Sequence, residues 1–258
     1  MPLFNMLSKL AQALFVIMLT TLPGTAEQQA IEHGTSFSRI YQAQQTSALD
    51  RLPQIVTTSG ANVTIVWDNT TILIDPTGSQ IQYAAYGSPD IVVLTRAHPD
   101  HLSVRTMIGM LRRNTVVLAP QAVINELPLM ISNNVITPFE IGAVQRVDGL
   151  EFTATAAVSE NSDQTDIGVI IGKDNTRIYI SGYTGATTQM AGLRDINAAV
   201  ISLAEGTDLR EMARAAAKIS PDLLVVNAYG NDNRKLRDFR TEMKKLNRAI
   251  KVQASESF

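Results

Sequence analysis

The chain has 258 residues, of which 45% are hydrophobic and 18% are charged, a composition typical of a folded globular protein. A net charge of −2 gives no basic footprint for nucleic acid, and the absence of cysteine excludes disulfides, thiolate nucleophiles and cysteine-based metal sites. The only three histidines, His33, His98 and His101, are too few to supply every histidine ligand of a two-metal centre.

The first 26 residues are predicted to be a signal peptide. Lys9 gives the positive start, residues 10–22 are mostly apolar, and the small residues before Ala26 suit cleavage after that position. The alternative is an uncleaved N-terminal anchor. We expect a periplasmic or secreted protein that has no membrane attachment after cleavage.

Residues 27–58 are predicted to form a helical lead-in. Apolar residues recur at a rough helical spacing over 36–52, and Pro53 ends the pattern. His33 lies in the polar beginning of this segment, where a solvated side chain without a role is expected.

Residues 59–258 are predicted to form one domain of alternating strands and helices. Its opening hairpin, strand–helix pairs, second set of strands and closing strand–helix units favour an α/β fold, an αβ/βα sandwich of two stacked sheets with helices outside. The main strands are expected at residues 62–67, 71–74, 91–94, 115–119, 134–137, 151–157, 167–171, 177–181, 198–203 and 223–226. Helices are expected at about 103–113, 121–127, 208–219 and 233–246.

The loop after the apolar run 91–94 has the residue types of a metal site. His98, Asp100 and His101 fall within four residues at the end of a buried strand, where ligands of a site converge. Arg96 lies in the same loop, and its guanidinium stays charged and cannot ligate a metal.

Four stretches in the right order resemble the lactonase-like branch of the metallo-β-lactamase superfamily, which includes proteins similar to ascorbate-6-phosphate lactonase. They are I-L-I-D-P at 72–76, T-R-A-H-P-D-H at 95–101, I-Y-I-S-G-Y-T-G at 178–185 and V-V-N-A-Y-G at 225–230. The second is similar to the family signature T-H-x-H-x-D-H. The resemblance implies the sandwich fold and metal-dependent hydrolysis.

The resemblance also implies seven ligand positions, and this chain departs from several of them. Arg96 replaces the first histidine of one metal site, and His98 keeps the second. The third histidine of that site is missing near residues 157–161, where Glu160 or Asp163 could stand in.

The implied second metal site is incomplete as well. Asp100 and His101 remain, whereas Tyr183 takes the place of the carboxylate that bridges the two metals and Ala228 takes the place of the final histidine. Phenolate ligation is unusual for zinc, so Tyr183 is interpreted first as pocket wall. Asp100 could also serve as an acceptor for backbone N–H groups of its loop.

Three interpretations follow for the pocket formed by Arg96, His98, Asp100, His101, Tyr183 and Ala228. Arg96 could replace a metal and pair with a carboxylate, Asp100 being nearest in sequence, which leaves a metal-free pocket for an anionic ligand. His98, Asp100 and His101 could instead hold a single zinc. The pocket could also be empty and the fold retained as a scaffold.

The predicted function is therefore that of an impaired, ligand-binding or scaffolding member of the superfamily, with no cofactor or a single zinc. The alternative is a mononuclear zinc hydrolase of an ester, lactone or amide, with Asp100 as the catalytic residue. The expected partner is a small-molecule or anionic ligand. The sequence leaves the oligomeric state open.

The predicted last helix is rich in basic residues. We interpret it as a solvated amphipathic face and expect no nucleic-acid partner, since aromatic residues are few nearby and the whole chain is acidic. The basic residues of this helix and of the residues just after it are Arg234, Lys235, Arg237, Arg240, Lys244, Lys245 and Arg248.

Overall fold

The computed structural model describes residues 48–57, 60–132, 136–158, 165–203, 205–227 and 232–254. The predicted signal peptide, His33 and the lead-in up to residue 47 lie outside this part. The chain divides into two compact units, residues 1–50 and 51–258, and the second contains the two sheets. Among the described residues, no helix combines the length and the apolar character needed to cross a membrane.

The first sheet has six strands in sequence order. They are β1 (Gln54–Thr57), β2 (Val63–Trp67), β3 (Thr70–Ile74), β4 (Ile91–Val93), β5 (Val116–Ala119) and β6 (Ile136–Pro138). β1 to β3 are antiparallel, and β3 to β6 are parallel. β1 falls within the predicted helical lead-in, so that prediction is wrong for residues 54–57. A four-residue strand beside a proline has too little periodicity to be recognised alone.

The second sheet has seven strands in the order β13-β12-β11-β10-β9-β8-β7. They are β7 (Val144–Val147), β8 (Leu150–Ala156), β9 (Ile167–Lys173), β10 (Thr176–Ile180), β11 (Ala198–Ser202), β12 (Leu223–Asn227) and β13 (Lys251–Ala254). β7 to β10 are antiparallel, and β10 to β13 are parallel. The two edge strands β7 and β13 are short and half polar, and the sequence did not predict them.

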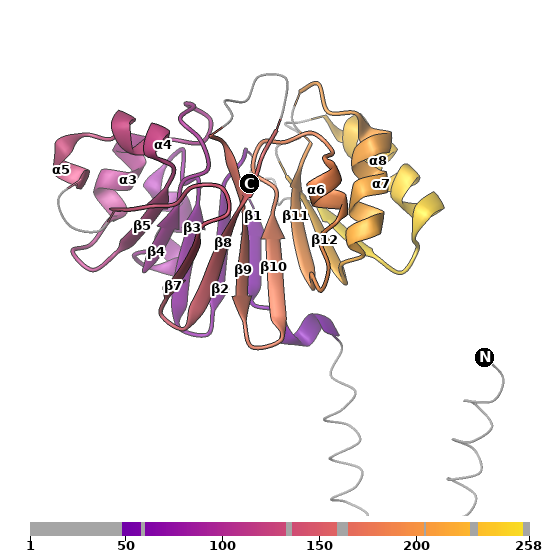
Figure 1. Cartoon of the computed structure of the whole chain (residues 1–258), viewed down its shortest axis with the longest axis horizontal. Helices are drawn as coiled ribbons and strands as arrows, with labels where there is room; N and C mark the ends of the chain where they lie inside the picture. Colours follow the sequence, from indigo (N-terminus) through magenta and orange to yellow (C-terminus); the bar gives the residue numbers. More distant parts are fainter. Residues whose placement is uncertain are drawn as a thin grey trace, which may run out of the picture. The chain divides into compact units, whose positions relative to one another are not determined.

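The helices cover the outer faces of the two sheets (Figure 1). On the first sheet lie η2 (Gln80–Tyr86), α3 (Val104–Met110), α4 (Gln121–Glu126) and α5 (Leu129–Ser132); on the second lie α6 (Thr188–Ala191), α7 (Leu209–Ile219) and α8 (Asn233–Leu246). A short η1 (Ala48–Arg51) precedes β1. Asp208 caps α7, since its side chain accepts hydrogen bonds from the backbone N–H groups of Arg210 and Glu211.

The main core lies between the two sheets. Alternating side chains of β2, β3 and β4 meet those of β8, β9 and β10, and Trp67, Phe139 and Phe152 are the largest buried residues there. Each outer face has its own apolar layer beneath the helices. The predicted αβ/βα sandwich is therefore confirmed. Its architecture brings the carboxyl ends of β3, β4, β10, β11 and β12 to one side.

Candidate functional site

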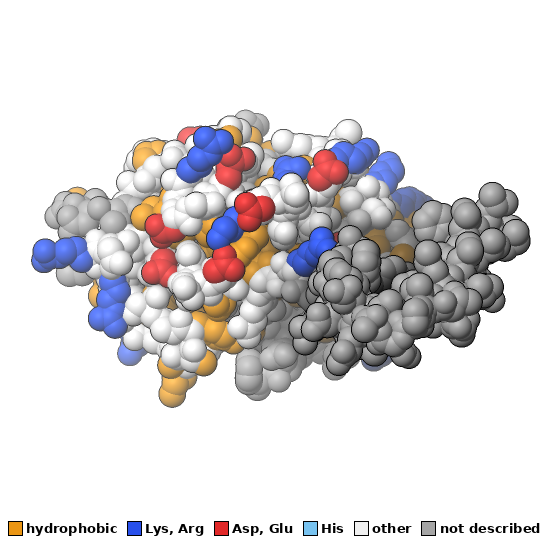
Figure 2. Space-filling view, turned by 90° about the horizontal axis from the view of Figure 1, so that it is seen from below, with side chains coloured by type: hydrophobic (Ala, Val, Ile, Leu, Met, Phe, Trp, Pro, Cys, Tyr) orange, Lys and Arg blue, Asp and Glu red, His pale blue; other side chains and the backbone are white. Residues whose placement is uncertain are grey.

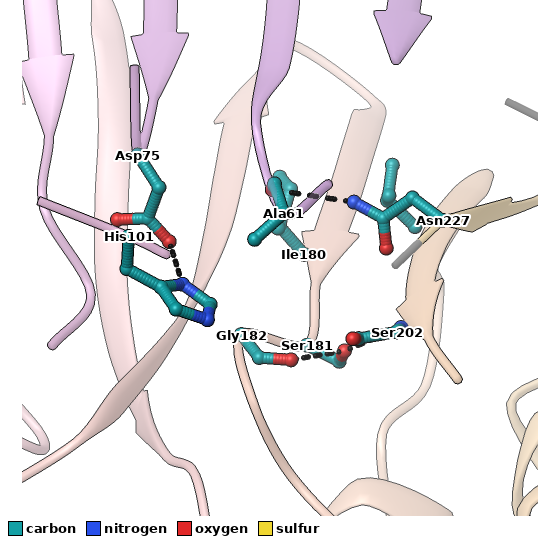
Figure 3. Close-up of a pocket in the computed structure, with 9 residues that line it drawn as sticks. Ala61, Asp75, His101, Ile180, Ser181, Gly182, Ser202 and Asn227 are labelled. Atoms are coloured by element: carbon teal, nitrogen blue, oxygen red, sulfur yellow. Dashed lines mark hydrogen bonds and ion pairs between the residues drawn. The ribbon is translucent and has the colours of Figure 1, made fainter. Parts of the chain in front are cut away.

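The ends of these strands contribute the polar residues of the candidate site. Asp75 follows β3, and Thr95 and Arg96 follow β4. From the second sheet come the loop after β10, Ser202 at the end of β11 and Asn227 at the end of β12. Figure 3 shows Asp75 and His101 on one side of a small cavity, with Gly182, Ser202 and Asn227 also lining it.

His101 is buried and held by Asp75. The His101 Nδ1 atom lies 2.7 Å from Asp75 Oδ2, and the two side chains are 4% and 2% exposed. The same carboxylate accepts hydrogen bonds from Thr95, at 2.7 Å from its backbone N–H and 2.5 Å from its hydroxyl. Asp75 thus binds the Nδ1 edge of the His101 ring, and the other edge of the imidazole faces the cavity (Figure 3).

His98 and Asp100 lie outside this buried network. Their side chains are 47% and 83% exposed, and His98 Nδ1 is 3.7 Å from Asp100 Oδ2. The backbone turns tightly here, because the N–H groups of His101 and Leu102 both donate to the His98 carbonyl. This turn directs His98 and Asp100 outward and His101 inward.

The three surviving ligand types therefore do not converge on one point. The ring centres of His98 and His101 are 6.4 Å apart. Within the described residues, no three histidine, cysteine or acidic side chains are grouped so that they could hold a metal ion. The proposed substitutes Glu160 and Asp163, and Ala228 at the final histidine position, lie outside the described residues.

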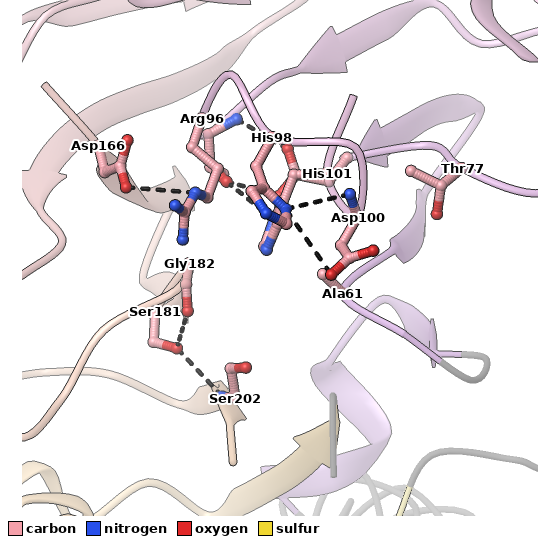
Figure 4. A network of polar contacts seen from close by, with 12 residues as sticks. Ala61, Thr77, Arg96, His98, Asp100, His101, Asp166, Ser181, Gly182 and Ser202 are labelled. Atoms are coloured by element: carbon pink, nitrogen blue, oxygen red, sulfur yellow. Dashed lines mark hydrogen bonds and ion pairs between the residues drawn. The ribbon is translucent and has the colours of Figure 1, made fainter. Parts of the chain in front are cut away.

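Arg96 points into the cleft, but its predicted partner was wrong. Its Nε atom lies 3.3 Å from Asp166 Oδ2, and the two side chains are 10% and 6% exposed (Figure 4). Asp100 is at the exposed tip of its turn, whereas β9 begins beside β4, where the Ile167 N–H donates to the Thr95 carbonyl at 3.0 Å. This contact brings Asp166 to Arg96 from 70 residues away.

Tyr183 lies against both Arg96 and His101. The Arg96 guanidinium carbon is 4.5 Å from the centre of the Tyr183 ring, a cation–π distance. The Tyr183 ring meets that of His101 edge-on, with centres 6.0 Å apart. The preceding Gly182 has φ +63°, and a Cβ there would lie 2.4 Å from the Ile167 carbonyl oxygen, so glycine is required.

A metal centre of the family type does not fit the described residues. The first ligand position that the resemblance implies carries Arg96, which cannot ligate a metal and is paired with Asp166. Of the inherited ligand types only His101 is buried at the cavity, while His98 and Asp100 face outward.

The cavity itself is narrow, and the side formed by Ser202 and Asn227 is polar. Its free volume is about 10 Å³, roughly the space of one water molecule. Ser202 Oγ and Asn227 Oδ1 are buried there and have no hydrogen-bond partner among the described residues. Asn227 is oriented by its amide, which donates to the Ala61 carbonyl at 3.3 Å.

Sequence reasoning missed four residues of this site, Asp75, Asp166, Ser202 and Asn227. Asp75, Ser202 and Asn227 share a usable signal, because each is a polar residue at the carboxyl end of a buried strand. Asp166 precedes its strand, and nothing in its local sequence marks it as the partner of Arg96.

The chain is similar to known hydrolases in sequence. Residues 70–229 match the beta-lactamase superfamily domain. A metal-dependent hydrolase of Methanoculleus marisnigri is 28% identical over 137 residues, which cover 49% of this chain and 56% of that protein. The match thus spans little more than half the length of this curated relative.

Solved structures show the same fold. A candidate metal-dependent hydrolase from Parabacteroides distasonis aligns with a TM-score of 0.66 and 21% identity, over 79% of this chain and 93% of that one. A metallo-hydrolase from the hyperthermophilic archaeon Ignicoccus hospitalis aligns with a TM-score of 0.66 and 20% identity, over 78% and 94% of the two chains. At these identities the likeness establishes the α/β metallo-β-lactamase fold.

Proposed function

Because the chain belongs to the beta-lactamase superfamily domain family, we propose that it is an exported member that binds a small anionic ligand or acts as a scaffold, without a binuclear metal centre. One observation carries this proposal. The buried group of Arg96, Asp166 and Tyr183 occupies the part of the cleft where the family resemblance implies the first metal.

The charge of this group argues against metal-dependent chemistry. Replacing a histidine by Arg96 adds one positive charge, and replacing the bridging carboxylate by Tyr183 removes one negative charge. A bridging carboxylate neutralises two adjacent cations and helps to orient the attacking hydroxide. Relative to the family pattern, both changes therefore disfavour a divalent cation. Asp166 offsets the charge of Arg96, so an anionic ligand would compete with this carboxylate for the guanidinium.

The second candidate is a mononuclear zinc hydrolase of an ester, lactone or amide. The relatives favour it, since their names describe metal-dependent hydrolases. They agree with this candidate better than with a ligand-binding protein. In this candidate His98, Asp100 and His101 hold one zinc and Asp100 is the catalytic residue, which requires the loop to turn His98 and Asp100 inward.

Metal content and turnover of the purified mature protein distinguish the two candidates. We expect no stoichiometric zinc and no metal-dependent turnover on panels of esters, lactones and amides. Two equivalents of zinc with metal-dependent turnover would overturn the proposal. One equivalent that is lost in His98→Ala, but kept in Arg105→Ala on the neighbouring helix, would establish the mononuclear hydrolase.

Anion binding is tested with phosphate, sulfate and citrate in thermal-shift titrations. We expect at least one anion to stabilise the wild type and to have less effect on Arg96→Gln. If none does, the scaffold form of the proposal remains and the ligand-binding form is wrong.

Export is tested by the mass of the protein recovered from cell fractions. We expect a chain that begins at Glu27 in the periplasm or medium. A chain with Met1 intact in the membrane fraction would show that residues 10–22 are an anchor.

A further inference from the structure

A second concave surface lies at the edge of the seven-stranded sheet, where the C-terminal half of α8 meets β13. It is a groove of about 300 Å³ whose lining has an apolar floor and a basic rim. The floor is formed by Met243, Ile250 and Val252, and the rim by Arg240, Lys244, Asn247 and Arg248. Among the residues that the structure describes, no acidic one lines it.

The other side of α8 shows what is unusual about this groove. There Glu242 accepts a hydrogen bond from Lys245 at 2.8 Å, and that bond, with Arg210 and Arg214 nearby, lowers the pKa of Glu242. On the face in Figure 2, basic and acidic side chains likewise lie interspersed. The groove has three cations together, none of them in an ion pair of the described residues.

Helix stability accounts for only part of this charge. A cation in the last turn of a helix interacts favourably with the helix dipole, which explains Lys244 and Lys245. It does not explain why Arg240, one turn earlier, and Arg248, beyond the helix end, share one concave surface with Lys244.

The strand beside the groove has an available edge. Among the described strands β13 pairs only with β12. The Lys251 N–H donates to the Asp222 carbonyl, so the alternation of a parallel strand turns the N–H and C=O of Val252 away from β12. The Val252 side chain packs toward the helical layer and forms part of the groove floor.

We propose that this groove binds an extended acidic peptide segment of a partner protein, which adds as a strand to β13. Main-chain hydrogen bonds to Val252 set its register, and its carboxylates meet Arg240, Lys244 and Arg248. Four extended residues span about 13 Å, the length of β13. A simple polyanion would use the three cations but neither the strand edge nor the apolar floor.

The probe is a fluorescein-labelled octapeptide of alternating Glu and Val, titrated with the full chain in fluorescence anisotropy. The same peptide with Lys in place of Glu should not bind. The triple variant Arg240→Gln, Lys244→Gln, Arg248→Gln should weaken binding by roughly tenfold or more, since each exposed charge contributes up to about 1 kcal/mol. The matched control Arg210→Gln, Arg214→Gln, Lys218→Gln on α7 makes the same charge change and should leave binding nearly unchanged.

Val252→Pro tests strand addition separately from charge. Proline is tolerated on an edge strand where the N–H faces outward, so the variant should fold, which circular dichroism checks. Losing one main-chain hydrogen bond of about 1 kcal/mol should lower the affinity for the peptide roughly fivefold. Val252→Thr keeps this N–H group and should leave the affinity unchanged. Unchanged affinity in Val252→Pro, or equal binding of phosphatidylglycerol vesicles or polyphosphate, would overturn the proposal in favour of a purely electrostatic surface.

Discussion

The two histidines of the loop after β4 lie three residues apart in opposite surroundings. His101 is almost fully buried, and its imidazole is bound to Asp75, which also binds Thr95. His98 is half exposed, and its side-chain partner is its neighbour Asp100, itself mostly exposed. We call Thr95 and His101, with their partner Asp75, the inner half of the loop; it is part of the folded core. We call His98 and Asp100 the outer half; their side chains have few structural constraints.

This difference separates the residues that hold the loop in place from those that do not. Residues that orient a ligand also connect strand ends, and Asp75, Thr95 and His101 join β3 to the loop after β4. Removing them costs stability whether or not a metal binds. The exposed side chains of His98 and Asp100 make no such connection, so their removal should cost little stability.

The largest expected effect is a gain of zinc binding when the family ligands are rebuilt. The triple variant Arg96→His, Tyr183→Asp, Ala228→His restores three of the implied ligand positions and removes the repelling charge, so it should bind zinc stoichiometrically. Arg96→His alone should not restore two metals, because positions 183 and 228 stay changed. Elemental analysis after dialysis measures the zinc content of the triple and the single variant. Two metals in Arg96→His alone would mean that we have misplaced the other ligands.

Breaking the inner half of the loop should cost the most stability. Asp75→Ala leaves two hydrogen-bond donors of Thr95 and one of His101 buried without their acceptor, at about 3 kcal/mol or more. Asp75 has φ +47°, which asparagine tolerates, so Asp75→Asn should cost less. Urea denaturation of the three proteins checks this order. Equal stability of Asp75→Ala and wild type would show that the network is not structural.

Removing Arg96 should cost somewhat less. Arg96→Ala leaves Asp166 buried without its ion-pair partner, for which we expect a loss of about 2–3 kcal/mol. Arg96→Lys keeps the charge but not the planar contact with Tyr183. Its free energy of unfolding should therefore lie between those of the wild type and Arg96→Ala. A mutant cycle with Asp166→Asn isolates the pair, and a coupling energy near zero would show that Arg96 acts without Asp166.

The smallest effects are expected from the outer half of the loop. His98→Ala and Asp100→Ala should each change the free energy of unfolding by less than about 0.5 kcal/mol, because both side chains are exposed. EDTA should leave the melting temperature of the wild type unchanged. If EDTA lowers it, and His98→Ala removes that sensitivity, the outer half binds a metal after all.

The sequence alone was sufficient for the sandwich, whereas the departures from the family ligands stay a prediction from the resemblance. Long apolar strands have a period that does not depend on distant neighbours, and a guanidinium cannot ligate a metal in any fold. It was not sufficient for the short edge strands β1, β7 and β13, whose four residues acquire their structure from pairing with the rest of the sheet.

Only the tertiary structure decided how the site is arranged. Sequence proximity suggested Asp100 as the partner of Arg96. A turn points Asp100 outward, however, and the start of β9 brings Asp166 to Arg96 instead. Ser202 and Asn227 meet at the cavity because parallel neighbouring strands end on the same side. Their residue types follow from the sequence, but burial, partner and direction arise from contacts between segments far apart along the chain.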